Sequence, residues 1–287
     1  MSLKLFIEQG EGNGVSQCVV DNIPHILTAL EDCDYIVSNK IPWGCANPHF
    51  IQEVLYCYKD ITKKVLVFMV SDYNEPLDIP NNVILFRTGF YKSQKKQNEH
   101  LLPFFGAKAE IKNHPSLQPL PKIGLQPIVG FCGYVVSHPT RIQFINKLKM
   151  IPNIKKNLTL RNEYWGGNPH NQQVVNEFIN NIKNSHFTLT TRGTGNWSAR
   201  FYQVLYLGRI PLFINTDMML PFEDRINWRD LIVYCDSEND IGNNLRNFWN
   251  TRDIDQAQIK CREVFETYLT PEKWSKIITE EILIPNK

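Results

Sequence analysis

Short apolar runs alternate with helical patterns in the first hundred residues. Runs rich in β-branched and aromatic residues predict buried strands, and apolar residues at helical spacing predict helices between them. The predicted strands are Leu3–Ile7, Tyr35–Ser38, Lys64–Val70 and Asn82–Phe86, and the predicted helices are Asn22–Leu30 and His49–Tyr58.

The alternation is more regular from residue 128 onward. Helices between successive strands are the crossovers that parallel strands need, so the pattern predicts an α/β fold with parallel sheets. The predicted strands are Ile128–Cys132, Leu158–Leu160, Phe187–Thr191, Ile210–Ile214 and Leu231–Cys235, and the predicted helices are Pro139–Met150, Gln172–Lys183, Ser198–Leu207 and two or three more between Asp240 and Ile282.

A proline-rich segment separates the two halves. Residues 103–127 contain 5 of the 17 prolines and no strong apolar period, which is typical of a linker. A length of 287 residues agrees with about two domains of roughly 150 residues each. We therefore predict one domain over residues 1–102, a linker over 103–127, and a second domain over 128–287 that ends in a helical tail.

Composition excludes several classes of protein. With 43% hydrophobic and 21% charged residues, the chain is expected to be globular rather than disordered. A net charge of +2 is too small to hold nucleic acid by neutralising phosphates along the whole surface. The seven cysteines form no C-x-x-C pair, which argues against a zinc site and against a disulfide framework.

The hydropathy pattern also bears on location. The longest purely apolar run, Val65–Val70, is far shorter than the ~20 residues that span a bilayer. Residues Met1–Ile7 lack the apolar core of a signal peptide. We expect a soluble cytoplasmic protein with no membrane span.

A glycine loop between a strand and a helix is the most informative local feature. The strand ends at Thr191, Gly193 and Gly195 follow, and the helix begins near Ser198 with Arg200 in its first turn. Glycines let a ligand approach the backbone, the helix start offers unpaired N–H groups, and a guanidinium can fork onto two phosphate oxygens. These parts suit a diphosphate site. An ordinary loop and N-cap, with Arg200 lying over an aromatic ring, is the alternative that remains open.

The residues around this loop resemble the core of the exostosin family, glycosyltransferase family 47. The similarity covers about two-fifths of the chain, from Ile128 to Asp236, and includes Gly130–Gly133 with the arginine at position 141. The short form without an anchor looks more like microbial or large-virus members than animal exostosins. The matching core residues are Phe187, Leu189, Arg192, Gly193, Trp197, Ser198, Arg200, Gly208, Ile210, Pro211, Leu220, Pro221, Phe222 and Trp228.

The resemblance implies a GT-B arrangement, in which two Rossmann-like domains face each other and the carboxy-terminal one holds a nucleotide sugar. It implies an inverting glycosyltransferase that moves a sugar, with xylose as one candidate, from a UDP-sugar to a glycan hydroxyl on the amino-terminal side. The chain departs from the family at Thr190–Thr191, where cysteine and proline are usual, and at Arg209, where cysteine is usual. The implied donor diphosphate contacts are Arg192, Gly193, Ser198, Arg200 and Arg141.

Inverting transfer also needs a group that takes the proton of the acceptor hydroxyl. Ligands of open α/β sheets bind at the carboxyl ends of strands, so carboxylates just past strand ends are the candidates. Asp72 is the first choice, and Glu11 and Glu163 are further candidates. An Asx turn is the alternative interpretation of Asp72.

Aromatic and imidazole side chains complete the expected binding residues. Tyr164 and Trp165 offer flat faces to a uracil base or a sugar ring, and Trp43 offers another in the amino-terminal half. His138 lies close to Arg141 in the sequence and is a candidate contact for donor phosphate. Ordinary packing is the alternative for each ring.

We expect no metal and no cofactor beyond the UDP-sugar co-substrate. A metal-dependent GT-A enzyme would hold Mg²⁺ or Mn²⁺ through Asp-x-Asp at a strand end, whereas Asp32–Asp34 precedes a strand and Asp253–Asp255 begins a helix. Two other functions stay open. The first is an inactive carbohydrate-binding or scaffold protein of the same fold. The second is a nucleotide-binding reductase or epimerase, for which the glycines at 10, 12 and 14 have the wrong spacing.

Overall fold

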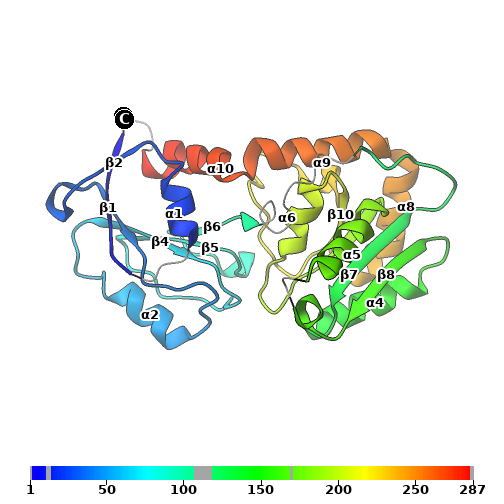
Figure 1. Cartoon of the computed structure of the whole chain (residues 1–287), viewed down its shortest axis with the longest axis horizontal. Helices are drawn as coiled ribbons and strands as arrows, with labels where there is room; N and C mark the ends of the chain where they lie inside the picture. Colours follow the sequence, from blue (N-terminus) through cyan, green and yellow to red (C-terminus); the bar gives the residue numbers. More distant parts are fainter. Residues whose placement is uncertain (1, 11–13, 107–117, 169–170, 285–287) are drawn as a thin grey trace.

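The computed structural model describes residues 2–10, 14–106, 118–168 and 171–284, which form two α/β units side by side (Figure 1). All strand pairs within each sheet are parallel. The first sheet has the order β2-β1-β3-β4-β5-β6 and the second the order β11-β10-β9-β7-β8. The predicted α/β fold, with two parallel sheets and a helical C-terminal region, is confirmed.

The strands lie close to the predicted ranges. Those of the first sheet are β1 (Leu3–Ile7), β2 (His25–Leu27), β3 (Tyr35–Ser38), β4 (Lys64–Met69), β5 (Val83–Arg87) and β6 (Glu99–Leu101). Those of the second sheet are β7 (Ile128–Tyr134), β8 (Lys155–Arg161), β9 (Phe187–Thr190), β10 (Ile210–Ile214) and β11 (Val233–Cys235).

The helices cover both sheets. Across the described residues, none combines the length and the apolar character needed to cross a bilayer. The α-helices are α1 (Gly14–Val20), α2 (Pro48–Tyr56), α4 (Pro139–Met150), α5 (Gln172–Lys183), α6 (Ala199–Tyr206), α7 (Trp228–Leu231), α8 (Ile241–Thr251), α9 (Ile254–Tyr268) and α10 (Pro271–Ile278). The shorter turns are η1 (Leu30–Asp32), η2 (Lys92–Gln94), η3 (Tyr164–Gly167), η4 (Glu238–Asp240) and η5 (Thr279–Leu283).

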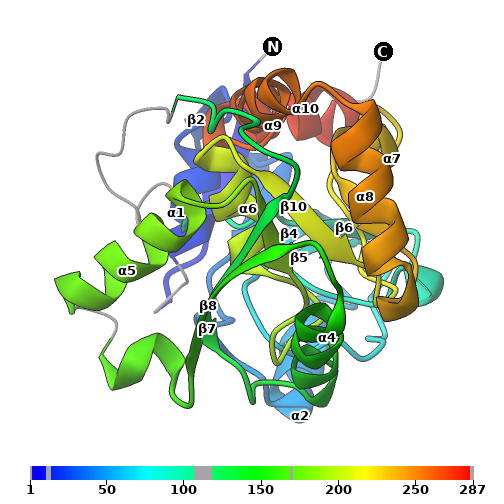
Figure 2. The same ribbon diagram turned by 90° about the vertical axis from the view of Figure 1, so that its right-hand side faces the viewer.

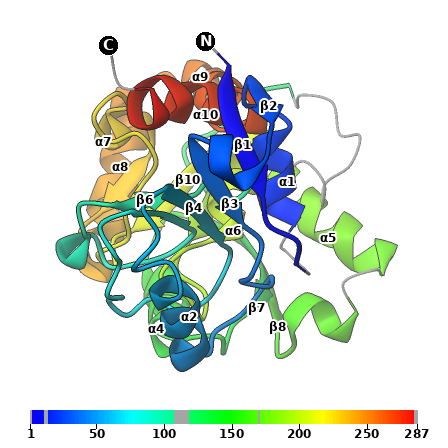
Figure 3. The same ribbon diagram turned by 90° about the vertical axis from the view of Figure 1, so that its left-hand side faces the viewer.

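Strand β4 shows why the first sheet is buried on both faces. Leu66 and Phe68 share a core with α1 and α10, whereas Val65 and Val67 share a core with α2. Because successive side chains of a strand point to opposite faces, α1 and α2 must cover opposite sides of the sheet, as Figure 3 shows. In the second unit, α4 and α5 likewise lie on opposite sides of β7 and β8 (Figure 2).

The last helix returns to the first unit. Trp274 of α10 is 2% exposed, packs edge-on against Phe86 at 5.4 Å between ring centroids, and belongs to the core of the first sheet. Beyond it, the backbone carbonyl of Leu283 accepts a hydrogen bond from the Tyr35 hydroxyl at 2.8 Å. In Figure 1, α9 and α10 run across the top from one unit to the other. The predicted boundaries put residues 128–287 in one unit, whereas α10 packs against the sheet of the other.

One predicted helix is wrong. Asn22–Leu30 contains no α-helix, because α1 ends at Val20 and His25–Leu27 form the edge strand β2. Pro24 explains the difference, since proline disfavours the helical conformation of the residue before it. The carbonyl of Pro24 instead accepts a hydrogen bond from the backbone of β1 at 3.0 Å.

The predicted linker lies partly outside the described residues, which omit 107–117. The described part packs along the helical tail. The side chain of Gln258 on α9 exchanges two hydrogen bonds with the backbone of Leu120, at 2.9 and 3.0 Å.

A buried ion pair fixes one end of the first sheet. Arg87 at the end of β5 meets Glu99 on β6, with 2.6 Å between Nε and Oε1 and side chains 2% and 1% exposed. The same guanidinium donates a hydrogen bond to the carbonyl of Glu75 at 3.1 Å. The pair therefore holds the loop after β4, which carries Asp72.

We expect Glu99→Gln to lower the free energy of unfolding by about 3–5 kcal/mol, because it leaves a buried guanidinium without its counter-charge. Urea denaturation followed by circular dichroism measures the change. Asp236→Asn is the matched control, since Asp236 pairs with Arg229 at 2.6 Å on the exposed surface and its loss should cost about 0–1 kcal/mol. Equal losses for the two variants would contradict this interpretation.

Candidate functional site

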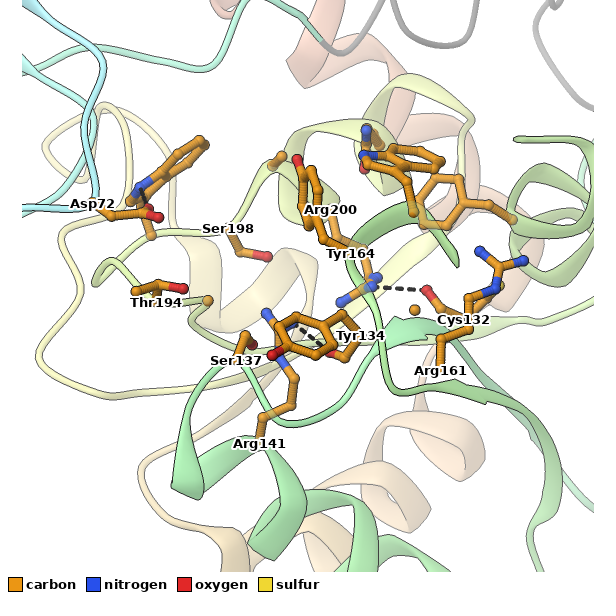
Figure 4. Close-up of a pocket in the computed structure, with 17 residues that line it drawn as sticks. Asp72, Cys132, Tyr134, Ser137, Arg141, Arg161, Tyr164, Thr194, Ser198 and Arg200 are labelled. Carbon is orange, nitrogen blue, oxygen red and sulfur yellow. Dashed lines mark hydrogen bonds between the residues drawn. The ribbon is translucent and has the colours of Figure 1, made fainter. Parts of the chain in front are cut away.

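A cavity of about 390 Å³ opens at the carboxyl ends of β7, β8 and β9. Asp72 of the first unit closes one side, and every other lining residue comes from the second unit (Figure 4). This is the edge of an open α/β sheet at which ligands bind. The lining residues are Asp72, Cys132, Gly133, Tyr134, Ser137, Arg141, Arg161, Tyr164, Trp165, Phe178, Gly193, Thr194, Trp197, Ser198, Ala199, Arg200 and Gln203.

The amino end of α6 faces this cavity. Ser198 is the N-cap residue, yet its side chain makes no capping hydrogen bond, and it lines the cavity with Ala199 and Arg200. The first N–H groups of a helix have no partner inside the helix and carry a partial positive charge. The arrangement is therefore suited to binding an anion, which is the role that the sequence of the glycine loop predicts.

Arg200 is a buried cation at the same place. It is 9% exposed, its Nη2 donates to the carbonyl of Cys132 at 2.8 Å, and its guanidinium lies 4.2 Å from the ring centroid of Phe131. Burial, and then the nearby charge of Arg141, lowers the pKa of Arg200 to about 9, so it is still charged at pH 7. Gly133 makes room for it, because a Cβ there would lie 2.6 Å from Nη2.

Arg141 lines the cavity but is bound to the backbone. Its guanidinium donates to the carbonyls of Tyr134 and Arg192, both at 2.8 Å. Burial lowers its pKa to about 10, and the negative charge of Asp72 opposes this shift. Arg141 therefore joins the ends of β7 and β9 and adds positive charge to the cavity wall.

Arg192 and His138 lie outside the cavity lining. Arg192 donates to the hydroxyl of Tyr91 at 3.2 Å and to the carbonyl of Thr194 at 3.1 Å, so its side chain links the loop to the first unit. His138 is the N-cap of α4 and accepts a hydrogen bond from the backbone of Thr140 at 3.3 Å. Burial, and then the charges of Arg192 and Arg141, lower the pKa of His138.

Positive charge exceeds negative charge in the described cavity lining, where Asp72 is the one carboxylate. Arg141 and Arg200 line the cavity and Arg192 lies next to it; all three are buried, and none forms an ion pair with a carboxylate in the part of the chain that the structure describes. A buried charge without a partner is costly, and at the wall of a cavity a ligand can supply the counter-charge.

Of the two predicted bases that the structure describes, Asp72 and Glu163, only Asp72 lines the cavity. Its Oδ1 accepts a hydrogen bond from the indole Nε1 of Trp197 at 2.9 Å. Glu163 is exposed at the start of η3 and does not line the cavity. Glu11 lies outside the described residues.

The two aromatic residues after β8 both reach the cavity. Trp165 has a positive φ of 50° and packs edge-on against Phe178 at 5.4 Å between centroids. Tyr164 is 68% exposed at the rim. Their position fits contact with a ligand in the cavity.

The two Asp-x-Asp sequences have structural partners. Asp34 accepts a hydrogen bond from the backbone of Lys4 at 2.8 Å, and Asp253 caps α9 by accepting from the backbone of Gln256 at 3.0 Å. Among the described residues, no three His, Cys, Asp or Glu side chains meet as candidate metal ligands.

Comparison with known proteins identifies this region. Residues 131–247 match the family model of the Exostosin GT47 domain. The resemblance predicted from the sequence is thus confirmed for the segment that forms the cavity.

Curated relatives of the GT47 domain match over short segments. They include a probable glucuronosyltransferase of Oryza sativa subsp. japonica (34% identity over 61 residues, 21% of this chain and 14% of the relative). Exostosin-1 of Drosophila melanogaster is 36% identical over 55 residues, which are 19% of this chain and 7% of that protein. A probable beta-1,4-xylosyltransferase of Arabidopsis thaliana is 33% identical over 61 residues, which are 21% of this chain and 15% of that protein. The matches thus span 7–15% of the length of these relatives.

Solved structures are similar over more of the chain but at low identity. WaaG, a glycosyltransferase involved in lipopolysaccharide biosynthesis, is 10% identical with a TM-score of 0.42, covering 96% of this chain and 100% of that one. A glycosyltransferase of kitacinnamycin is 6% identical with a TM-score of 0.40, and the match covers 97% of this chain and 98% of that one.

The GT47 cavity also contains residues that the sequence pattern does not single out. Ser137 lies just past β7 with its buried Oγ unpartnered, and Arg161 ends β8 with Glu177 as its partner at 2.7 Å. Both follow the rule that placed Asp72, since they sit at or just past the carboxyl end of a strand. Trp197 appears in the family pattern, but only the structure shows its bond to Asp72.

We expect Arg200→Met to weaken anion binding without lowering stability. Methionine keeps apolar contact with Phe131 and removes a buried charge that lacks a counter-charge, which is neutral or stabilising. A hydrogen bond to a charged group contributes about 1.5–3 kcal/mol, so affinity for inorganic diphosphate should fall roughly 10- to 100-fold. Calorimetry and thermal unfolding measure the two effects.

The matched control is Arg209→Met. Arg209 is 2% exposed and donates to the carbonyl of Lys183 at 3.1 Å, outside the cavity lining. This variant should lose stability, because the carbonyls of Lys183 and Gly208 lose three hydrogen bonds in all, and it should keep diphosphate affinity. The opposite pattern, with Arg200→Met unstable yet still binding, would show that Arg200 is structural.

Proposed function

We propose that the chain is an inverting glycosyltransferase that moves a sugar from a UDP-sugar to a hydroxyl group of a glycan. The observation that carries the proposal is Arg200, buried without a carboxylate partner beside the amino end of α6, in a cavity within the GT47 segment. The names of the relatives, which include a glucuronosyltransferase and a xylosyltransferase, support sugar transfer. Xylose is one candidate for the transferred sugar.

The donor occupies the second unit in this proposal. Its diphosphate binds the N–H groups of α6, the Ser198 hydroxyl and Arg200, while Arg141 adds positive charge from the wall. Gly193 contributes room for the ligand, since its N–H already donates to the carbonyl of Trp197 at 3.0 Å. Tyr164 and Trp165 contact the nucleoside or the sugar. Arg192 acts through the loop, because its guanidinium bonds to Tyr91 and Thr194.

The acceptor approaches from the side of the first unit, where Asp72 lies. Asp72 takes the proton of the acceptor hydroxyl as its oxygen forms a bond to the anomeric carbon. The bond from that carbon to the donor diphosphate breaks on the opposite face, so UDP leaves with the electron pair and the configuration inverts. Arg200 and α6 stabilise the charge on UDP, and exposed Asp72 releases its proton to water.

This division of roles needs no metal ion. In metal-dependent transfer, a divalent cation neutralises the leaving diphosphate. Here the buried arginines and the helix end supply that positive charge, so we propose transfer without a metal cofactor.

We expect UDP or a UDP-sugar to raise the Tm of the protein with EDTA present throughout, because the protein itself supplies the counter-charge. A thermal-shift screen of UDP, GDP and their sugars measures this, and adding Mn²⁺ after EDTA removal is the control. Stabilisation by no nucleotide would refute the proposed function. Stabilisation that needs Mn²⁺ would refute only the metal-independent step, and binding without any transfer would indicate an inactive carbohydrate-binding or scaffold protein.

We expect Asp72→Asn to reduce the transfer rate roughly 100- to 10,000-fold, the usual contribution of a general base. The amide oxygen can still accept the Trp197 hydrogen bond, so affinity for UDP should stay unchanged. Asp78→Asn is the control, since Asp78 is an exposed carboxylate of the same unit that does not line the cavity. Transfer at the wild-type rate by Asp72→Asn would remove Asp72 as the base.

A further inference from the structure

Trp43 is 55% exposed, the largest exposed fraction of any tryptophan that the structure describes. A large aromatic ring gains most from leaving water, so an indole held at the surface beside a ligand cavity needs an explanation. The mechanism above does not use Trp43.

The turn that carries Trp43 is fixed to the strand end that carries Asp72. The backbone N–H of Gly44 donates to the carbonyl of Val70 at 2.9 Å, and the Ser71 hydroxyl donates to the carbonyl of Cys45 at 2.5 Å. Gly44 has a φ of +74°, a conformation that favours glycine and lets the turn adopt this path. The two hydrogen bonds thus join the residues that directly follow Trp43 to the residues that directly precede Asp72.

Aromatic contacts connect Trp43 to the cavity. Its ring centroid lies 6.4 Å from that of Phe104, and Phe104 lies 5.5 Å from Trp197. Trp197 lines the cavity and donates its indole N–H to Asp72. Phe104 is 4% exposed, so Trp43 is the solvent end of a packed row that leads to the proposed base.

We propose that Trp43 is the platform on which a pyranose ring of the acceptor glycan stacks. The inference rests on the proposed function and names a binding residue for its acceptor. A pyranose whose hydroxyls are equatorial presents a flat face of C–H groups, which suits an indole face that is open to solvent. Phe104 supports the indole from within, so little side-chain entropy is lost when the sugar binds.

The position also suits a chain of sugars rather than a single one. The acceptor hydroxyl must reach Asp72, while Trp43 lies further out along the aromatic row. One ring on Trp43 and another at Asp72 therefore belong to the same oligosaccharide. The acceptor class is an oligosaccharide of pyranose units with equatorial hydroxyls.

The test compares wild type, Trp43→Ala and Trp43→Phe on an array of immobilised β-linked oligosaccharides of xylose, glucose, galactose and N-acetylglucosamine. Aromatic stacking of about 0.5–1.5 kcal/mol corresponds to roughly a 2- to 13-fold loss of affinity for Trp43→Ala. Trp43→Phe should recover most of the signal, because it keeps a flat face. Met150→Ala is the control, since Met150 is 81% exposed at the end of α4 remote from Arg141.

UDP affinity, measured by calorimetry on the same preparations, separates the possible failures. All variants should bind UDP as wild type does, which also shows that they are folded. Glycan binding that is equal in wild type and Trp43→Ala, or absent in wild type, overturns the Trp43 proposal even where UDP binds. Failure of wild type to bind UDP refutes the proposed function, whatever the array shows.

Discussion

The cavity depends on how closely the loop before α6 approaches the first unit. A Cβ at Gly195 would lie 2.6 Å from the indole of Trp197 and 2.7 Å from Asp72, and a Cβ at Gly89 would lie 2.8 Å from the same indole. Two glycines, one from each unit, thus leave space for one tryptophan. The side chain of Asn196 reinforces the contact by donating to the carbonyl of Phe90 at 3.1 Å. Because of this contact, Asp72 of the first unit and Arg200 of the second line the same cavity.

Two buried arginines show how the same energetic problem has two solutions. Arg87 meets Glu99 in the first sheet and needs nothing from outside. Arg200 has aromatic faces and a backbone carbonyl but no carboxylate. Desolvation penalises both cations, and the proposed anionic ligand would supply the counter-charge that Arg200 lacks. Burial and a missing counter-charge do not by themselves mark a binding arginine, because Arg209 shares both and lies outside the cavity lining. What sets Arg200 apart is that it also lines a cavity at the start of a helix.

Local patterns predicted most of the second unit, because its long helices have clear sequence signals at their ends. Proline at 139 begins α4, and Gly208, with a φ of +66°, follows the end of α6. The three-residue strands β2 and β6 escaped prediction because they contain polar side chains and form no apolar run, whereas β11 of the same length lies in the apolar run that predicted it. In the site, Ser198, Arg200 and Asp72 followed from their positions at strand ends and the helix start. The different orientations of Arg141 and Arg192 could not follow, because partners from distant segments set them: the carbonyl of Arg192 for Arg141, and the hydroxyl of Tyr91 for Arg192.

The path of α10 has a consequence for the order in which the chain folds. Trp274, Ile278 and Leu283 belong to the core of the first sheet, although the last strand of that sheet ends at Leu101. A ribosome synthesising the chain from its amino terminus makes these three side chains after all strands of the second sheet. Part of one face of the first sheet therefore stays open to water until the second unit has been made.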